Sequence, residues 1–189
     1  MYKGNIVLLG APGSGKGTLA AQLKEKYKYT VITAGDLLRI EKKSGSEIGQ
    51  KINNLIGKGN LVPDEIISEL IERELGRVRN TYILDGFPRT IAQGEFLEEK
   101  DVPGLVIYLD VKDDTIRERI LERGKTSGRD DDQELSIINK RIKQFKSETF
   151  PLIDFYKAKK VLTYVDGEGS IEEVFEMVEN ILRIWSWFS

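Results

Sequence analysis

The sequence contains neither cysteine nor histidine. This absence excludes disulfides, thiolate chemistry, zinc sites built from cysteine and histidine, and imidazole acid–base catalysis. No apolar run is long enough to span a membrane, and we expect the first residues to form a buried strand rather than a targeting signal. The net charge is −2 and the pI about 5.5, so neither nucleic acid nor an anionic membrane is expected as the main partner. We therefore expect a soluble, cytoplasmic protein.

The chain of 189 residues suits a single domain, 1–189, in which apolar β-rich runs alternate with segments of helical spacing. This alternation predicts an α/β fold with a parallel sheet covered by helices on both faces. The predicted strands are 6–9, 30–33, 81–84, 105–109 and 161–165. The predicted helices are 16–27, 35–43, 47–57, 63–76, 115–123, 134–157 and 170–183. Ligands of such sheets bind at the carboxyl ends of the strands.

A glycine-rich stretch, GAPGSGKGT at 10–18, follows the first predicted strand. It matches the phosphate-binding pattern G-x-x-x-x-G-K-[ST] up to Lys16. Gly13, Gly15 and Gly17 allow the tight turn that aims several backbone N–H groups into one concavity. The helix that starts near Lys16 adds its positive end, and the lysine adds a full charge. The stretch therefore predicts a site for nucleotide phosphates rather than an ordinary glycine turn.

Gly17 stands where the pattern has a serine or threonine whose hydroxyl holds Mg²⁺. Without that hydroxyl, we expect no direct protein ligand to the metal, which the nucleotide phosphates and water would hold while a carboxylate orders the water. Two carboxylates follow predicted strands: Asp85 in YILDGFPR and Asp110 in VIYLDV. Asp85 is favoured because Gly-Phe-Pro-Arg follows it, whereas Asp110 also fits the start of a helix.

Further short motifs follow along nearly the whole chain. They are AGDLLR at 34–39, KGNLVP at 58–63, LDGFPR at 84–89, ERGKTSGR at 122–129 and GEGSIEEVF at 167–175. In this order they resemble the nucleoside monophosphate kinases, first the short-lid adenylate kinases and next the UMP-CMP kinases. In this family GKGT is the usual loop ending.

The resemblance implies a P-loop NTPase fold with a five-stranded parallel sheet, an acceptor lobe at 33–62 and a short lid at 123–133. It implies reversible transfer of the ATP γ-phosphoryl group to AMP, giving two ADP, by a monomer that uses Mg²⁺ with ATP and no zinc. Phosphoryl transfer needs two anions held in line and their charge neutralised, which suits a chain rich in arginine.

Roles for individual residues also follow from the resemblance. The implied catalytic residues are Lys16, Asp85, Arg89, Arg123, Arg129 and Arg141. ATP would contact Gly13, Ser14, Gly15, Lys16, Gly17, Thr18, Arg119, Arg123 and Gly169. AMP would contact Thr33, Ala34, Arg39, Asn60, Leu61, Val62, Gly86, Phe87, Pro88, Arg89, Gln93, Arg129 and Arg141. Arg117 and Arg183 lie outside these motifs and are expected on the surface.

The lid departs from the family by one residue. The resemblance implies eleven positions from the SGR arginine to the next catalytic arginine, whereas Arg129 and Arg141 are twelve apart. NKRIKQF preserves the flanks of Arg141, and Lys140 is its rival. Two of the acidic residues 130–132 are expected to brace the lid arginines.

Two residues give conflicting indications of which base the acceptor nucleotide carries. Gln93 offers a donor and an acceptor to adenine, and the resemblance implies glutamine here in adenylate kinases and asparagine in UMP-CMP kinases. Ala34 stands where adenylate kinases have threonine and UMP-CMP kinases have alanine. We favour AMP and keep CMP or UMP as the alternative.

Two other functions are considered. A GTPase-type regulator would need an Asn-Lys-x-Asp motif to bind guanine, and this sequence does not contain one. A non-catalytic nucleotide-binding protein of this fold would be expected to lose phosphate-binding residues, and none is lost here. The tail 184–189 is expected to pack on the core, with a contact to a partner or a membrane as the alternative.

Overall fold

The computed structural model describes residues 2–56, 62–102, 104–126, 132 and 134–187. In these residues five parallel strands form one sheet in the order β2-β3-β1-β4-β5. The strands are β1 Ile6–Gly10, β2 Thr30–Thr33, β3 Tyr82–Asp85, β4 Leu105–Asp110 and β5 Leu162–Asp166. The helices are α1 Lys16–Tyr27, α2 Ala34–Lys43, α3 Glu47–Ile56, α4 Asp64–Leu75, α5 Ile91–Glu98, α6 Asp113–Thr126, α7 Leu135–Gln144, the π-helix η2 Phe145–Thr149, α8 Pro151–Ala158 and α9 Ile171–Trp185.

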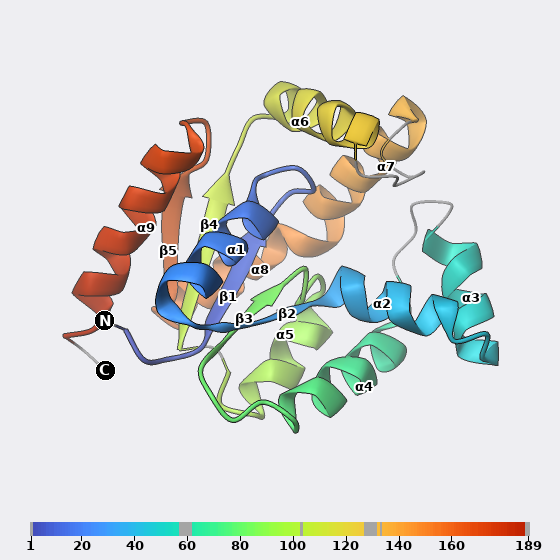
Figure 1. Ribbon diagram of the computed structural model, residues 1–189, viewed down its shortest axis with the longest axis horizontal. Helices are drawn as coiled ribbons and strands as arrows, with labels where there is room; N and C mark the ends of the chain where they lie inside the picture. Colours follow the sequence, from blue (N-terminus) through green and yellow to red (C-terminus); the bar gives the residue numbers. More distant parts are fainter. Residues whose placement is uncertain (1, 57–61, 103, 127–131, 133, 188–189) are drawn as a thin grey trace.

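Alternation along the strands divides the core between the two faces of the sheet. Ile6 and Leu8 of β1 face a cluster with α1 and α9, whereas Val7 and Leu9 face a cluster with α4, α5 and α8 (Figure 1). All four side chains are buried, as expected for a parallel sheet covered on both sides. The predicted fold class, an α/β P-loop fold with a five-stranded parallel sheet, is confirmed.

The predicted elements differ from the observed ones mainly around 145–150. The prediction of one helix over 134–157 is wrong, because α7, η2 and α8 divide this segment. Pro151 is the first residue of α8, where its missing N–H and fixed φ are tolerated; inside a longer helix they would not be. Helix α5 is absent from the predicted elements, although Thr90 caps it by accepting a hydrogen bond from the Gln93 backbone.

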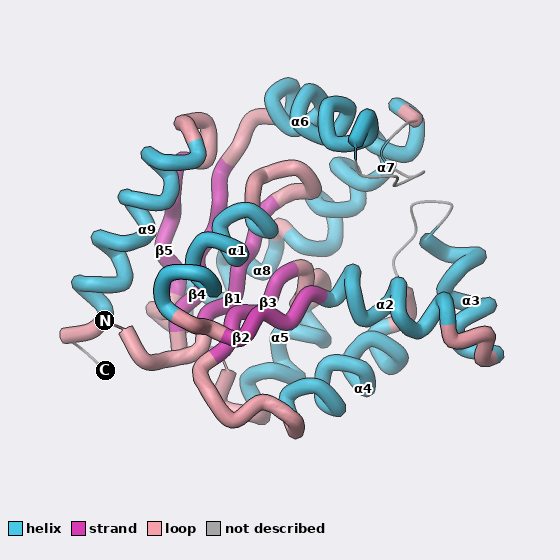
Figure 2. Tube along the Cα trace, in the orientation of Figure 1, coloured by secondary structure: helices cyan, strands magenta, loops and turns pink. Residues whose placement is uncertain are grey.

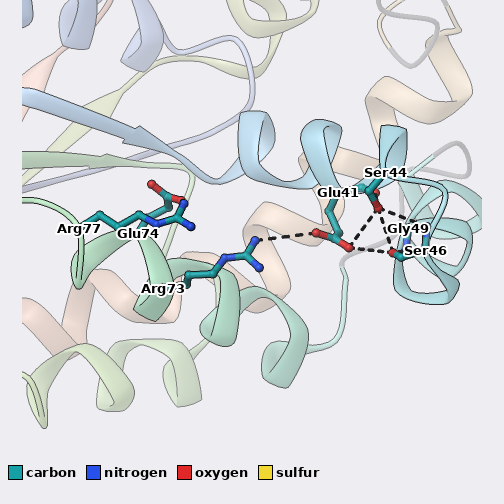
Figure 3. Close-up of polar contacts among 7 residues, drawn as sticks. All are labelled: Glu41, Ser44, Ser46, Gly49, Arg73, Glu74 and Arg77. Atoms are coloured by element: carbon teal, nitrogen blue, oxygen red, sulfur yellow. Dashed lines mark hydrogen bonds and ion pairs between the residues drawn. The ribbon is translucent and has the colours of Figure 1, made fainter.

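Helices α2 and α3 project to one side of the sheet, at the right in Figure 1. Their connection is held by polar contacts: Ser46 donates to Glu41 at 2.8 Å and accepts from the Gly49 backbone N–H at 2.9 Å. Arg73 of α4 lies 3.8 Å from the other Glu41 oxygen (Figure 3). Three helices are thereby linked through Glu41. Among the described residues, no helix combines the length and apolar character needed to cross a membrane.

Candidate active site

A cleft of about 900 Å³ lies at the carboxyl edge of the sheet, and residues at or just beyond the ends of all five strands line it. Figure 2 shows the loops after β1, β4 and β5 on the same side of the sheet. Parallel strands bring their carboxyl ends together, so motifs far apart in sequence meet at this edge. The lining includes the glycine-rich loop, the end of β3 and the segment after β5.

The glycine-rich loop turns through positive φ at Gly13 and Gly15, with angles of 84° and 98°. A side chain at Gly13 would also meet Ile120, since an added Cβ would lie 2.7 Å from it. Helix α1 begins at Lys16 directly after this turn. The loop therefore presents a helix N-terminus to the cleft, where anions bind favourably.

The Lys16 ammonium lies within this loop. It donates to the carbonyl oxygens of Gly10 and Ala11, both at 2.8 Å, and more weakly to Ser14 Oγ at 3.4 Å. Removal from water lowers the pKa of Lys16 to about 8; Asp85 opposes this change, and the nearby charges of Arg89, Arg123 and Arg141 add to it. Four cations thus share one small region, which favours a polyanionic ligand.

Asp85 ends β3 and is 9% exposed. Its Oδ2 would lie 3.6 Å from a Cβ added at Gly17, the position at which the loop lacks a hydroxyl. In the part of the chain that the structure describes, no three acidic, histidine or cysteine side chains gather into a metal-binding group. Asp110, the rival carboxylate, is exposed and accepts from the Tyr108 hydroxyl at 3.2 Å.

The lid side is organised by Asp132, which is fully buried. Arg123 donates to both of its oxygens, at 2.7 and 2.9 Å, and Arg141 donates to Oδ1 at 2.7 Å. Burial raises the pKa of this carboxyl, but the hydrogen bonds and charges of the two arginines outweigh burial and leave the pKa below its ordinary value. Asp132 therefore braces two lid arginines, as expected for the acidic run; residues 130 and 131 lie outside the described residues.

The segment after β5 meets α6 beside the loop. Arg119 donates to the Gly167 carbonyl at 2.9 Å. Glu168 accepts from the Lys112 backbone N–H at 2.6 Å and from the Thr115 hydroxyl at 2.9 Å. These contacts bring Arg119 and Gly169 to the same end of the cleft.

On the opposite side, Arg39 and Arg89 face the cleft. Arg39 forms an ion pair with Asp36, one helical turn away. Arg89 Nε donates to the Gly86 carbonyl at 2.9 Å. Gln93 is only 3% exposed and does not line the cleft: its oxygen accepts from the Arg89 backbone and its nitrogen donates to Asp64. These hydrogen bonds use one N–H and one lone pair of the amide, which has two of each. The predicted contact between Gln93 and a base therefore requires the buried side chain to become accessible from the cleft, and neither hydrogen bond has to break.

The structure brings most of the predicted site residues to this one cleft. Those lining it are Gly13, Ser14, Gly15, Lys16, Gly17, Thr18, Thr33, Arg39, Asp85, Gly86, Pro88, Arg89, Arg119, Arg123, Arg141 and Gly169. Ala34, Val62 and Phe87 are buried outside the lining. Asn60, Leu61 and Arg129 lie outside the described residues.

Several lining residues were missed by the sequence analysis. Leu38 belongs to AGDLLR and could have been found from that motif. Gln144 and Phe145 end NKRIKQF and could have been found from that stretch, whereas Lys42 and Thr149 belong to no motif.

Comparison with known proteins agrees with this geometry. The family described as "Adenylate kinase" matches residues 8–161. The chain belongs to the adenylate kinase family. It is 41% identical over 177 residues to "Adenylate kinase isoenzyme 1" of Gallus gallus, covering 92% of this chain and 91% of that protein. It is 42% identical over 184 residues to "Adenylate kinase" of Xanthomonas campestris, covering 94% and 98%.

The bacterial and vertebrate relatives are equally similar to this adenylate kinase family member. "Adenylate kinase" of Flavobacterium psychrophilum is 40% identical over 186 residues, covering 95% of this chain and 98% of that protein. The predicted resemblance to the nucleoside monophosphate kinases, and within them to the adenylate kinases, is confirmed. Adenylate kinases are enzymes, so membership of this family sets the chain apart from the GTPase-type regulators considered as an alternative.

Proposed function

We propose that this chain transfers the γ-phosphoryl group of ATP reversibly to AMP, giving two ADP. One observation carries the proposal: Lys16, Arg89, Arg123 and Arg141 come from four separate segments and face one cleft. A phosphoryl group in transfer spreads negative charge over its oxygens, and fixed cations around it stabilise that charge. Membership of the adenylate kinase family supports the same reaction.

Each cation would have a distinct part in this reaction. Lys16 would exchange its contacts with Gly10 and Ala11 for phosphate oxygens of ATP. Arg89 would lie between donor and acceptor, while Arg123, Arg141 and the lid residue Arg129 would close from the other side. The guanidinium fork binds two oxygens at once and stays charged, so these arginines hold the anions in line without proton transfer.

Mg²⁺ would enter with ATP and add positive charge to the phosphates. The residues fit such an ion held through water, since Asp85 faces Gly17, which has no hydroxyl, and no group of three metal-binding side chains forms among the described residues. Asp85 would then order the ion's water shell rather than bind it directly, and no zinc is expected in the lid.

The two nucleotides would occupy opposite ends of the cleft. Arg119 and Gly169 would contact the ATP base, beside Gly13, Ser14, Gly15, Gly17 and Thr18 at the phosphates. Arg39 would bind the AMP phosphate after releasing Asp36. The remaining proposed AMP contacts are Thr33, Ala34, Asn60, Leu61, Val62, Gly86, Phe87, Pro88 and Gln93. Residues 33–62 would form the moving acceptor lobe and 123–133 the lid.

Action as a monomer is part of this proposal. The net charge of −2 argues against nucleic acid as a partner, whereas the cations gathered in the cleft favour small anionic substrates. CMP or UMP is the second candidate acceptor, because Ala34 lacks the hydroxyl of the threonine that adenylate kinases have at this position.

The deciding experiment measures ADP formation from Mg-ATP with AMP, CMP and UMP offered separately at equal concentration. We expect a rate with AMP at least about tenfold above the others, the discrimination that one base contact can supply. Ala34→Thr tests the pyrimidine alternative, which predicts that this variant loses activity with CMP or UMP. No ADP with any acceptor would contradict the proposed reaction.

A further inference from the structure

Asp64, the first residue of α4, holds two side chains of another segment. Its Oδ1 accepts from Gln93 Nε2 at 2.6 Å, and its Oδ2 accepts from Thr90 Oγ1 at 2.7 Å. The partners lie 29 and 26 positions later in the chain, so these are tertiary contacts rather than ordinary helix capping. Both oxygens of the carboxylate are directed at the segment that follows DGFPR.

The Gln93 amide can take only one orientation between its neighbours. Its Oε1 accepts from the Arg89 backbone N–H at 2.7 Å, and an N–H can only donate. The Asp64 carboxylate on the other side can only accept, so Nε2 must face it. Gln93 is 3% exposed, which keeps water from replacing either partner.

Arg89 is fixed at its backbone from two directions. Gln93 holds the N–H, and Thr149 of η2 donates to the Arg89 carbonyl at 2.9 Å. The side-chain Nε then donates to Gly86. The peptide unit that carries this arginine is thus held between α5 and η2, while Asp64 orients the α5 partner.

We propose that Asp64 is a positioning residue, which fixes Arg89 through the Gln93 amide and so sets its guanidinium for phosphoryl transfer. This inference rests on the proposed function, because it gives Arg89 a role in that reaction. Asp64 also lies two positions after the end of the proposed acceptor lobe 33–62, so it ties the end of that lobe to Arg89. A displacement of about 1 Å at a reacting group costs on the order of a hundredfold in rate.

The test is an exchange of the two groups. Gln93→Glu places two carboxylates face to face, and we expect kcat to fall about a hundredfold through misplacement of Arg89. Asp64→Asn combined with Gln93→Glu restores the pattern, because the new amide donates to the new carboxylate, which still accepts from Arg89. The double variant should recover kcat to within about threefold of the wild type, and a double-mutant cycle that includes Asp64→Asn isolates the coupling.

Glu65→Gln is the matched control, since Glu65 is the exposed carboxylate next to Asp64 on α4. We expect this variant to match the wild type. A role for Gln93 in base recognition alone predicts a different result: KM for AMP would rise alike in Gln93→Glu and in the double variant, with kcat unchanged, and this would overturn the proposal.

Hydrogen exchange at the Arg89 amide gives a readout that does not depend on activity. We expect slow exchange in the wild type and the double variant and faster exchange in Gln93→Glu. Equal exchange in all three, or a double variant as slow in turnover as Gln93→Glu, overturns the proposal. A wild-type protein that forms no ADP would instead contradict the proposed function, while the exchange pattern would still test whether Asp64 and Gln93 hold Arg89.

Discussion

Arg141 donates a hydrogen bond of 2.7 Å to Asp132, whose side chain is fully buried. This contact turns Arg141 towards the cleft, whereas the preceding Lys140 is exposed on the same helix. Two neighbouring cations that the sequence leaves as rivals therefore lie in different surroundings.

Arg141→Ala should lower kcat/KM by on the order of 10²–10⁵-fold, because it removes a cation proposed to stabilise the transferring phosphoryl group. Lys140→Ala is the control one position away and should stay close to the wild type. Steady-state rates of ADP formation check both. If Lys140→Ala were the damaged variant, the assignment of Arg141 would be wrong.

Asp132→Asn should change the acid stability of the protein. The pKa of Asp132 lies below its ordinary value of 3.8, so the folded state favours the ionised carboxylate. The contribution of Asp132 to the free energy of unfolding is therefore present above a pH of about 4 and is lost as the pH falls through the lowered pKa. Denaturation midpoints at a series of pH values should show the wild type losing its advantage over Asp132→Asn in acid. A constant difference at all pH values would contradict this account.

The pH profile of the enzyme should have an alkaline limb that is due to Lys16. Because its pKa is lowered to about 8, kcat/KM for ATP should fall as the pH rises through about 8. Bound phosphates favour the charged lysine, so the limb in kcat should lie at higher pH. In the unliganded protein this group makes stability rise with pH between about 8 and 10.5, where the unfolded chain binds more protons.

Lys16→Arg is the control for that pH profile. Arginine stays charged throughout this range, so the limb near pH 8 should disappear even if the rate is lower. Lys16→Ala should reduce turnover by orders of magnitude with the fold intact. The same alkaline limb in Lys16→Arg would assign it to another group.

Arg89→Ala should reduce turnover by on the order of 10²–10⁵-fold without unfolding the protein. Arg183→Ala is the matched arginine deletion on the exposed face of α9 and should leave the rate unchanged. ADP formation and thermal unfolding, measured on both variants, separate catalysis from stability. Near-normal turnover in Arg89→Ala would contradict the proposed mechanism.

Nucleotides should close the acceptor lobe and the lid over the cleft, since excluding water prevents hydrolysis of ATP. The chain has no cysteine, so spin labels can be attached at Lys51→Cys on α3 and Glu118→Cys on α6 without removing native thiols. This distance should shorten when Mg-ATP and AMP are added. A pair at Lys24 and Glu172, on α1 and α9, serves as a control that should not change. An unaltered first distance would exclude closure.

Several features could be read from short stretches of sequence. The bounds of α1 and β2 match the predictions, because buried strands and glycine turns leave strong local signals. GAPGSGKGT alone predicts the phosphate loop, and DGFPR marks the end of β3. The start of α8 could have been read from Pro151, which a helix interior does not tolerate, whereas nothing in the spacing of 145–149 predicts a π-helix.

The sequence by itself determined the fold class and the family, and it predicts the residues that bind phosphates, because each depends on local periodicity and on motifs of fixed spacing. Only the tertiary structure decided which charges share an environment. It brings Asp132 to Arg123 and Arg141, turns Gln93 towards Asp64, and collects four cations near Lys16. These interactions join residues that are far apart in the chain. Their strength depends on burial and on distance in the folded protein, and the spacing of residues in the sequence encodes neither.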